Sequence, residues 1–191
     1  MRKITAVLIS ASCLFLTGCP QVSTVDSGYP AEITMIGESP NYPMEAAGFQ
    51  RAEVIAYAPG MMHMSTAYNL RSPEVQVAAT IYIVPHEAAV PDFSGRFDAE
   101  KSTIEDYHPG AILVEQEEVE LVKNGKRYAA RKAAYEFSGV FDFREQKLYS
   151  EVVLLSHKGS YVKLRSTSPA AQRAAARQKN MDLLEAVNWA Y

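Results

Sequence analysis

Turn residues divide the second half of the chain into strand-like segments. Asn124-Gly125 follows one such segment, and Asn-Gly is the dipeptide that best accepts the two positive φ angles of a type I′ turn. Lys158-Gly159-Ser160 stands in the same position between two further segments. These turns join residues 112–122 to 128–137 and residues 149–157 to 161–167. The pattern therefore predicts two β-hairpins, which together give an antiparallel run of four strands.

Earlier apolar runs predict another hairpin and a long strand. The hairpin starts at Phe49 and turns at Pro59-Gly60. Residues 75–84 follow and are rich in β-branched and aromatic side chains. The side chains of one parity are Val75, Val77, Ile81 and Ile83, and those of the other include Tyr82 and Val84. We therefore expect a central strand with both faces covered.

Two segments have the period of a helix. The first, residues 92–110, has Asp98 as its predicted N-cap. In the second, Ser168 is the predicted N-cap, Pro169 fills the first turn, and the helix continues to about Ala190. Its predicted apolar positions are Ala170, Ala174, Met181, Leu184 and Val187, with Trp189 near the end. Together with the strands, these helices predict an α+β fold in which an antiparallel β-sheet is flanked by helices.

The first residues of the chain have the pattern of a secretory signal peptide. Arg2 and Lys3 give a positive start, and an apolar run follows from Ile4 to Leu16. A helix needs about 20 apolar residues to cross a bilayer, so this run is too short to span one. We therefore expect residues 1–18 to be a signal peptide that is removed.

Leu16-Thr17-Gly18-Cys19 resembles the lipobox of bacterial lipoproteins. The resemblance implies that a diacylglyceryl group is attached to the Cys19 thiol, that the chain is cleaved before Cys19, and that the new amino terminus is acylated, for example with palmitate. Several acyl chains would hold the protein durably at a membrane. The alternative is an unmodified Cys19 after an ordinary signal peptide. Cys13, in contrast, lies in the discarded segment.

The residues after Cys19 predict a tether before one globular domain. Residues 19–48 hold four prolines and show no sustained period, which is typical of an extended linker, although an edge strand over 32–36 remains an alternative. We expect a single α+β domain over 49–191. Bacterial lipoproteins that stay in the inner membrane carry Asp after the lipidated cysteine. Pro20 stands there instead, so we expect transport to the outer membrane of a Gram-negative bacterium, with the domain facing the periplasm.

The charge of the mature chain argues against nucleic-acid binding. The full sequence has 19 Lys and Arg against 22 Asp and Glu, and removal of residues 1–18 takes away two of the basic residues. With 17 basic and 22 acidic residues, the net charge becomes −5. No run of Lys or Arg forms a basic stripe for a phosphate backbone.

A search for catalytic and metal-binding patterns finds none. The histidines are isolated, the sequence has no nucleophile motif, and its glycines form no phosphate-binding loop. We therefore expect no metal, no cofactor and no enzymatic activity. The four histidines are His63, His86, His108 and His157. The acidic cluster of Glu115, Glu117, Glu118 and Glu120 has two interpretations, a pair of catalytic carboxylates or the solvated edge strand that we favour.

Tyr161, Lys163 and Arg165 form a candidate binding patch. They alternate with the apolar Val162 and Leu164, so they share one face of a predicted strand. A basic and aromatic face of this kind could hold an anionic ligand or an acidic partner. The alternative is an ordinary solvent-exposed face, or a face whose cations pair with acids on neighbouring strands.

The order of predicted elements resembles the PsbP-like superfamily. That order is a hairpin, the strand ending in Tyr82-Ile83-Val84-Pro85, a helix, four antiparallel strands and a terminal helix after Ser168-Pro169. The resemblance implies an α/β/α sandwich over residues 49–191. Because members of this superfamily are mostly accessory or assembly proteins, it also implies a role without catalysis.

These observations favour one function and leave another open. The first is a membrane-anchored, non-catalytic envelope lipoprotein that presents its domain to a protein partner in the envelope. The alternative is a lipoprotein that binds a small ligand or a lipid in a pocket between the sheet and the terminal helix, near Tyr161, Lys163 and Arg165.

Overall fold

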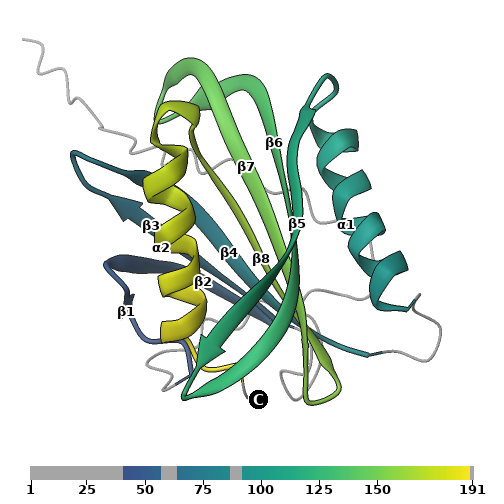
Figure 1. Cartoon of the computed structure of the whole chain (residues 1–191). Helices are drawn as coiled ribbons and strands as arrows, with labels where there is room; N and C mark the ends of the chain where they lie inside the picture. Colours follow the sequence, from purple (N-terminus) through teal and green to yellow (C-terminus); the bar gives the residue numbers. More distant parts are fainter. Residues whose placement is uncertain (1–40, 57–63, 87–91, 190–191) are drawn as a thin grey trace, which may run out of the picture.

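A single antiparallel sheet of eight strands forms the centre of the molecule (Figure 1). The computed structural model describes residues 41–56, 64–86 and 92–189. The order across the sheet is β1-β2-β3-β4-β8-β7-β6-β5. The strands are β1 Glu45–Ala46, β2 Phe49–Ala56, β3 Met64–Arg71, β4 Gln76–Pro85, β5 Ile112–Lys123, β6 Lys126–Phe141, β7 Arg144–His157 and β8 Ser160–Pro169.

Tight turns fix the register of the predicted hairpins. Asn124 and Gly125 have φ values of 51° and 72°, so the β5–β6 turn has the positive φ at both positions that a type I′ turn requires. Lys158 and Gly159 do the same between β7 and β8. Both predicted hairpins are confirmed, and so is the pairing of β2 with β3. The predicted turn at Pro59-Gly60 lies outside the described residues.

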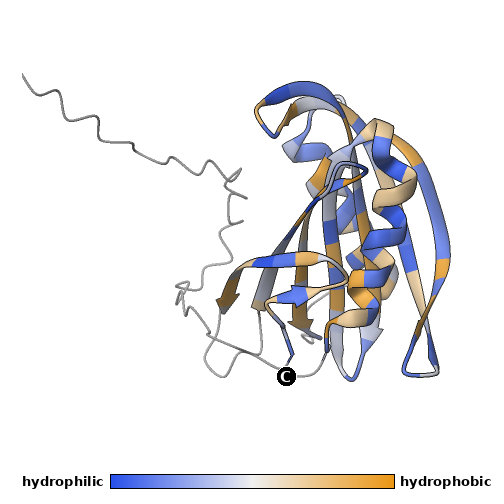
Figure 2. Cartoon of the chain, turned by 90° about the vertical axis from the view of Figure 1, so that its left-hand side faces the viewer, coloured by the Kyte–Doolittle hydropathy of each residue, from blue (hydrophilic) through white to orange (hydrophobic). Residues whose placement is uncertain are grey.

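A helix covers each face of the sheet. Helix α1, Phe93–Tyr107, buries Phe97 and Ile104 against β6 and β7, whereas α2, Arg173–Ala186, packs on the opposite face. Alternating residues of β7 and β8 therefore face different helices, and Figure 2 shows the alternation of hydrophobic and hydrophilic residues along the strands. The predicted antiparallel sheet flanked by helices is confirmed.

Three local predictions are wrong for identifiable reasons. The N-cap of α1 lies six residues before the predicted one, because the side chain of Asp92, not Asp98, accepts the backbone N–H of Gly95 at 2.9 Å. Ser168 caps no helix: it pairs with Tyr149 in the ladder of β7 with β8. A short 3-10 turn, Ala170–Gln172, separates β8 from α2, and α2 ends at Ala186 rather than near Ala190.

The buried face of α2 also differs from the predicted one. It consists of Ala176, Asn180, Leu183 and Leu184, and Val187 and Trp189 continue it after the helix ends. Ala170 and Ala174 lie outside it because the helix starts later than predicted and its phase is shifted. A buried asparagine in this face was not expected.

Strand β4 is interior, as predicted, but only one of its faces is fully buried. Val77, Ala79, Ile81 and Ile83 contribute to the core on the α2 side. On the other face Ala78, Thr80 and Tyr82 are half-buried, because α1 packs over β6 and β7 and leaves this part of the sheet without a helix (Figure 1).

The sheet includes residues that the sequence placed in the tether. Strand β1 pairs with β2, and Tyr42 is 2% exposed in a small cluster with Val54, Met64 and Ile83. Asn41 accepts a backbone hydrogen bond from Asn188 at 3.0 Å, so the start of the described chain lies beside its end. Residues 1–40, with the predicted signal peptide and lipobox, lie outside the described residues.

Strands β6 and β7 form a longer hairpin than predicted. They continue to Phe141 and Arg144, which are joined by Asp142 and Phe143 in a turn with φ values of 50° and 62°. Phe143 is 85% exposed. In Figure 1 this turn lies at the top of the molecule, at the end opposite the C-terminus.

Candidate functional site

The predicted patch lies beneath α1 rather than on an open face. Tyr161, Lys163 and Arg165 do share one face of β8, as predicted, but α1 packs on this side of the sheet. The terminal helix α2 covers the opposite face. A pocket between the sheet and the terminal helix would therefore not include these residues, which corrects the predicted location.

Tyr161 serves the core of this face. It is 7% exposed and belongs to the cluster that α1 forms with β6 and β7. Its ring centroid lies 4.0 Å from that of His86, and Phe93 of α1 packs on it at 6.2 Å. Tyr161 thus fixes the beginning of α1 against β8.

Lys163 is bound to a buried carboxylate from α1. Its Nζ donates to Glu100 Oε2 at 2.7 Å, and Arg96 contacts Glu100 Oε1 at 2.7 Å. The ammonium also lies 4.0 Å from the centroid of the Tyr82 ring. Burial alone would raise the pKa of Glu100, but Lys163 and Arg96 outweigh burial and lower it. One carboxylate therefore serves two cations.

Arg165 is half-buried and hydrogen-bonds a serine rather than a carboxylate. Its Nε donates to Ser150 Oγ at 3.2 Å, and among the described residues no Asp or Glu oxygen lies within 4.0 Å of the guanidinium. Its positive charge acts on His108, whose pKa is lowered by burial and by Arg165. Arg165 keeps its own charge despite burial, because a guanidinium does not lose its proton in proteins.

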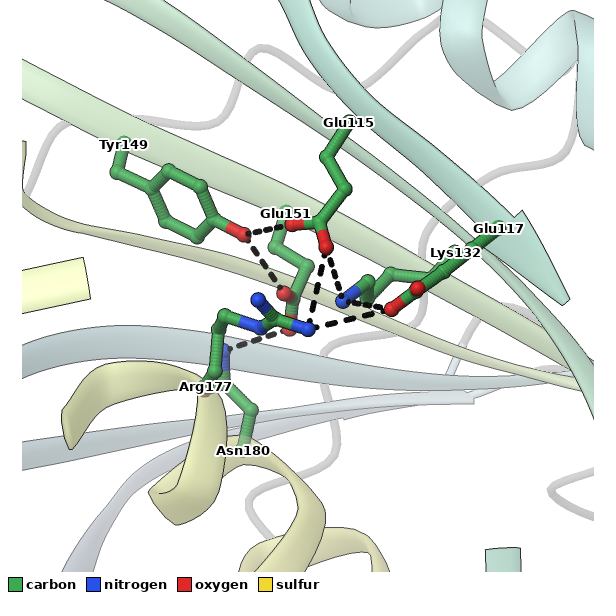
Figure 3. A network of polar contacts seen from close by, with 7 residues as sticks. All are labelled: Glu115, Glu117, Lys132, Tyr149, Glu151, Arg177 and Asn180. Carbon is green, nitrogen blue, oxygen red and sulfur yellow. Dashed lines mark hydrogen bonds and ion pairs between the residues drawn. The ribbon is translucent and has the colours of Figure 1, made fainter. Parts of the chain in front are cut away.

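A second polar cluster lies on the α2 face of the sheet (Figure 3). Lys132 on β6 is only 3% exposed, and its Nζ lies 2.6 Å from Glu117 and 3.3 Å from Glu115 on β5. Arg177 of α2 contacts the same two carboxylates at 3.2 Å each. The hydrogen bond from Lys132, the largest of several influences, lowers the pKa of Glu117. These contacts bind the edge strand to both β6 and α2.

Glu151 is the most deeply buried acid of this cluster. Asn180 Nδ2 donates to its Oε1 at 3.1 Å, and the Tyr149 hydroxyl lies 3.1 Å from its Oε2. The same hydroxyl is 3.4 Å from Glu115, although a phenol has a single proton to donate. Burial raises the pKa of Glu151, and burial with the nearby acids raises that of Tyr149. The Tyr149 hydroxyl donates to Glu151 Oε2, and its contact with Glu115 is the longer of the two.

Sequence reasoning found only part of this cluster. The two parities of the acidic residues are confirmed: Glu115 and Glu117 face Lys132, whereas Glu118 contacts Arg131 on the other face. Strand β5 is an edge of the sheet, as favoured. Lys132, Glu151 and Asn180 were missed. A signal was present, because charged residues interrupt strands that are otherwise apolar, but only the fold shows that they meet.

One histidine contacts a serine at the surface. His86 Nε2 lies 3.3 Å from Ser156 Oγ, and both residues are exposed. Within the described part of the chain no carboxylate bonds the His86 ring, so the contact lacks the group that orients a catalytic base. His63 lies outside the described residues. In the ranges 41–56, 64–86 and 92–189 no three His, Cys, Asp or Glu side chains form a group that could hold a metal.

Comparisons with known proteins add little to this geometry. No protein-family model matches the chain, and no curated protein matches it in sequence. Among solved structures the chain is similar to a Pseudomonas aeruginosa protein of unknown function, with 14% identity and a TM-score of 0.47. That match covers 70% of this chain and 94% of the other. A likeness at this level supports no inference about family or function.

The described residues include two α-helices, α1 and α2. Neither is long and apolar enough to cross a bilayer.

Proposed function

We propose that this chain is a non-catalytic envelope lipoprotein, anchored through Cys19 to the outer membrane of a Gram-negative bacterium and facing the periplasm. Leu16-Thr17-Gly18-Cys19 directly after a short apolar run is the observation that carries the proposal. We further infer that the domain is of the PsbP-like type. A helix on each face of an antiparallel sheet supports that inference.

The function that we propose for the domain is docking of a protein partner. Three exposed apolar side chains support this function: Phe143 is 85% exposed, Val140 70% and Ile112 66%. Phe143 also has a positive φ, which is uncommon for a bulky residue, so the turn presents an aromatic ring to water at some backbone cost. We call Ile112, Val140 and Phe143 the apolar end.

The apolar end faces away from the point where the anchor joins the domain. Asn41 lies beside Asn188 near the C-terminus, whereas the β6–β7 turn lies at the other end of the sheet (Figure 1). Strand β6 has 16 residues, which at about 3.3 Å each separates the two ends by about 50 Å. The apolar end therefore lies at the opposite end of the domain from the point where the tether joins it, and we propose a protein with an apolar pocket as its occupant.

Mass spectrometry of the mature amino terminus tests the anchor. We expect a first residue Cys19 that carries a diacylglyceryl group and an amide-linked acyl chain, and we expect C19S to leave the membrane fraction. An amino terminus at residue 1, or an unmodified Cys19, would refute the anchoring.

Site-specific photo-crosslinking in intact cells tests the docking. A photoreactive amino acid at position 143 should give one discrete crosslinked protein. The matched control replaces Val122, which is 48% exposed near the β5–β6 turn at the other end of the sheet, and should not give that product. Crosslinks of residue 143 to lipid alone would contradict a protein partner.

A further inference from the structure

The polar groups beneath α1 carry an excess of positive charge. Arg96, Lys163 and Arg165 lie around a single ion-paired carboxylate, Glu100, which is already bound to the first two. Two further acids of α1 lie near this site: Glu105 accepts a hydrogen bond from Tyr135 at 2.8 Å, and Asp98 pairs with Lys101 at 3.0 Å. Arg165 is half-buried, and Glu100, the acid that acts on it, is already paired with Arg96 and Lys163. A bound anion would remove this imbalance.

We propose that Arg165 binds an oxyanion, the phosphate or carboxylate group of a small molecule, on the face of β4 and β8 beside α1. The planar guanidinium has five N–H donors: Nε donates to Ser150 Oγ, and the other donors have no acceptor among residues 41–56, 64–86 and 92–189. The remaining donors match the paired oxygens of a phosphate or carboxylate. This site is separate from the apolar end and does not depend on the proposed partner.

The neighbours of Arg165 on β4 have small side chains. Thr80 is the direct cross-strand neighbour of Arg165, and Ala78 pairs with Thr167 one step further along the same face. All are half-buried, and α1 does not extend over β4 (Figure 1). The hydroxyls of Thr80 and Thr167 would be additional donors to an oxyanion.

A hollow lies beyond Ala78, near the ends of β3 and β4 that are joined by their turn, and Arg165 and Thr80 are not among its lining residues. Ala78 lines it together with residues of β3, β4 and the β6–β7 turn. The polar lining residues are Asn69, Arg71, Gln76 and Asp142. Arg71 is exposed and lies 3.7 Å from Asp142, so the hollow could hold the polar remainder of a small ligand whose anionic group reaches Arg165.

Thermal unfolding of the full-length chain in detergent tests the site. Inorganic phosphate and acetate serve as probes at pH 7, with chloride at equal ionic strength as the reference. Because a ligand stabilises the state that it binds, we expect phosphate, acetate or both to raise the Tm by about 2–5 °C at saturation. R165Q should abolish the rise, whereas R144Q, which removes an exposed arginine at the start of β7, should keep it. An equal rise in R165Q, or none in the natural chain, would overturn the proposal.

A second pair of variants keeps the test valid if R165Q does not fold. T80E places a carboxylate directly across from Arg165. This carboxylate should pair with the guanidinium and so take the place of the bound anion. We expect T80E to fold and to show no response to either probe, whereas T80Q, of the same length without the charge, should respond like the natural chain. A full response in T80E would refute the site. Because neither variant touches Cys19 or Phe143, these results leave the proposed anchor and partner untouched.

Discussion

Asn180 on α2 and Glu151 on β7 join helix to sheet through a hydrogen bond of 3.1 Å in a fully buried position. Around them three carboxylates, Glu115, Glu117 and Glu151, share two cations. Beneath α1 the group around Glu100 has the opposite imbalance, because Arg96, Lys163 and Arg165 surround this one carboxylate. A proton on Glu151 can neutralise the first face, whereas the second can be neutralised only by an anion, because arginine does not give up its proton. Buried charge on the two faces of the sheet can therefore be neutralised in two different ways, by a proton on one face and by an anion on the other.

Glu151 should make stability fall as the pH rises. Burial raises the pKa of Glu151 in the folded chain above the unfolded value of about 4.3. Between these two pKa values the folded state holds a proton that the unfolded state has lost, so the free energy of unfolding decreases with increasing pH. E151Q keeps the shape without the titration, so its urea-unfolding free energy should be less pH-dependent between pH 5 and 8.

A matched control for E151Q is E118Q. Glu118 lies on the same sheet, but its side chain is 82% exposed, and its replacement should leave the pH profile of the natural chain almost unchanged. Identical profiles for E151Q and the natural chain would show that Glu151 is ionised throughout this range.

Lys132 should contribute more to stability than an exposed lysine with a similar ion pair. K132M leaves Glu115 and Glu117 without their buried cation, and we expect a loss of about 2–3 kcal/mol, somewhat below the cost for a fully buried pair because both acids are partly exposed. K147M removes a bridge of 2.8 Å to Glu136 from a side chain that is 68% exposed, and should cost less than about 1 kcal/mol. Chemical denaturation measures both, and equal losses would contradict the burial argument.

The strands could be predicted because their signals are local. Asn124-Gly125 and Lys158-Gly159 set turns whose geometry depends on two residues, and the parity of Val77, Ile81 and Ile83 follows from the strand period. The β6–β7 turn was missed because it lacks such a local signal. Both of its residues have positive φ, but Asp142-Phe143 is not a dipeptide that favours this conformation.

The candidate sites depend on neighbours that are distant in the sequence. Lys163 meets Glu100 across 63 residues, and the patch that they form was predicted only as one face of a strand. From the sequence alone, that face of β8 could not be assigned to α1 or to α2. The order of elements along the chain places α1 before β5 and α2 after β8, but it does not show which side of the sheet each helix covers. Glu151 similarly depends on Asn180, a polar residue in a helix face that the pattern predicts to be apolar.

The start of α1 gives a direct comparison between the predicted and observed caps. D92A removes the acceptor of the Gly95 N–H and should cost about 1 kcal/mol. D98A removes only the surface ion pair with Lys101 at 3.0 Å, from a side chain that is 66% exposed, and should cost about 0.3 kcal/mol. The two values come from equilibrium urea unfolding. A larger loss in D98A would mean that α1 begins where the sequence pattern placed it.

Phe143, which we propose as a docking group, should be dispensable for folding. F143G replaces a residue at φ 62° by the one that adopts this conformation most easily, and the lost side chain is 85% exposed. We therefore expect the free energy of unfolding to stay constant or to rise by up to about 1 kcal/mol.

A substitution in the β5–β6 turn is the control, because it should lower the free energy of unfolding. Gly125 has a φ of 72°, and an added Cβ would meet no atom within 4 Å, so G125A should lose about 1 kcal/mol from the backbone alone. A loss of more than 1 kcal/mol in F143G would mean that the Phe143 ring packs against the domain, and the ring would then be part of the fold rather than a docking group. A photoreactive amino acid at position 140 then reports on the partner in the F143G variant. If F143G keeps its stability but loses the crosslink, the missing ring is the cause, because the turn that carries it remains folded.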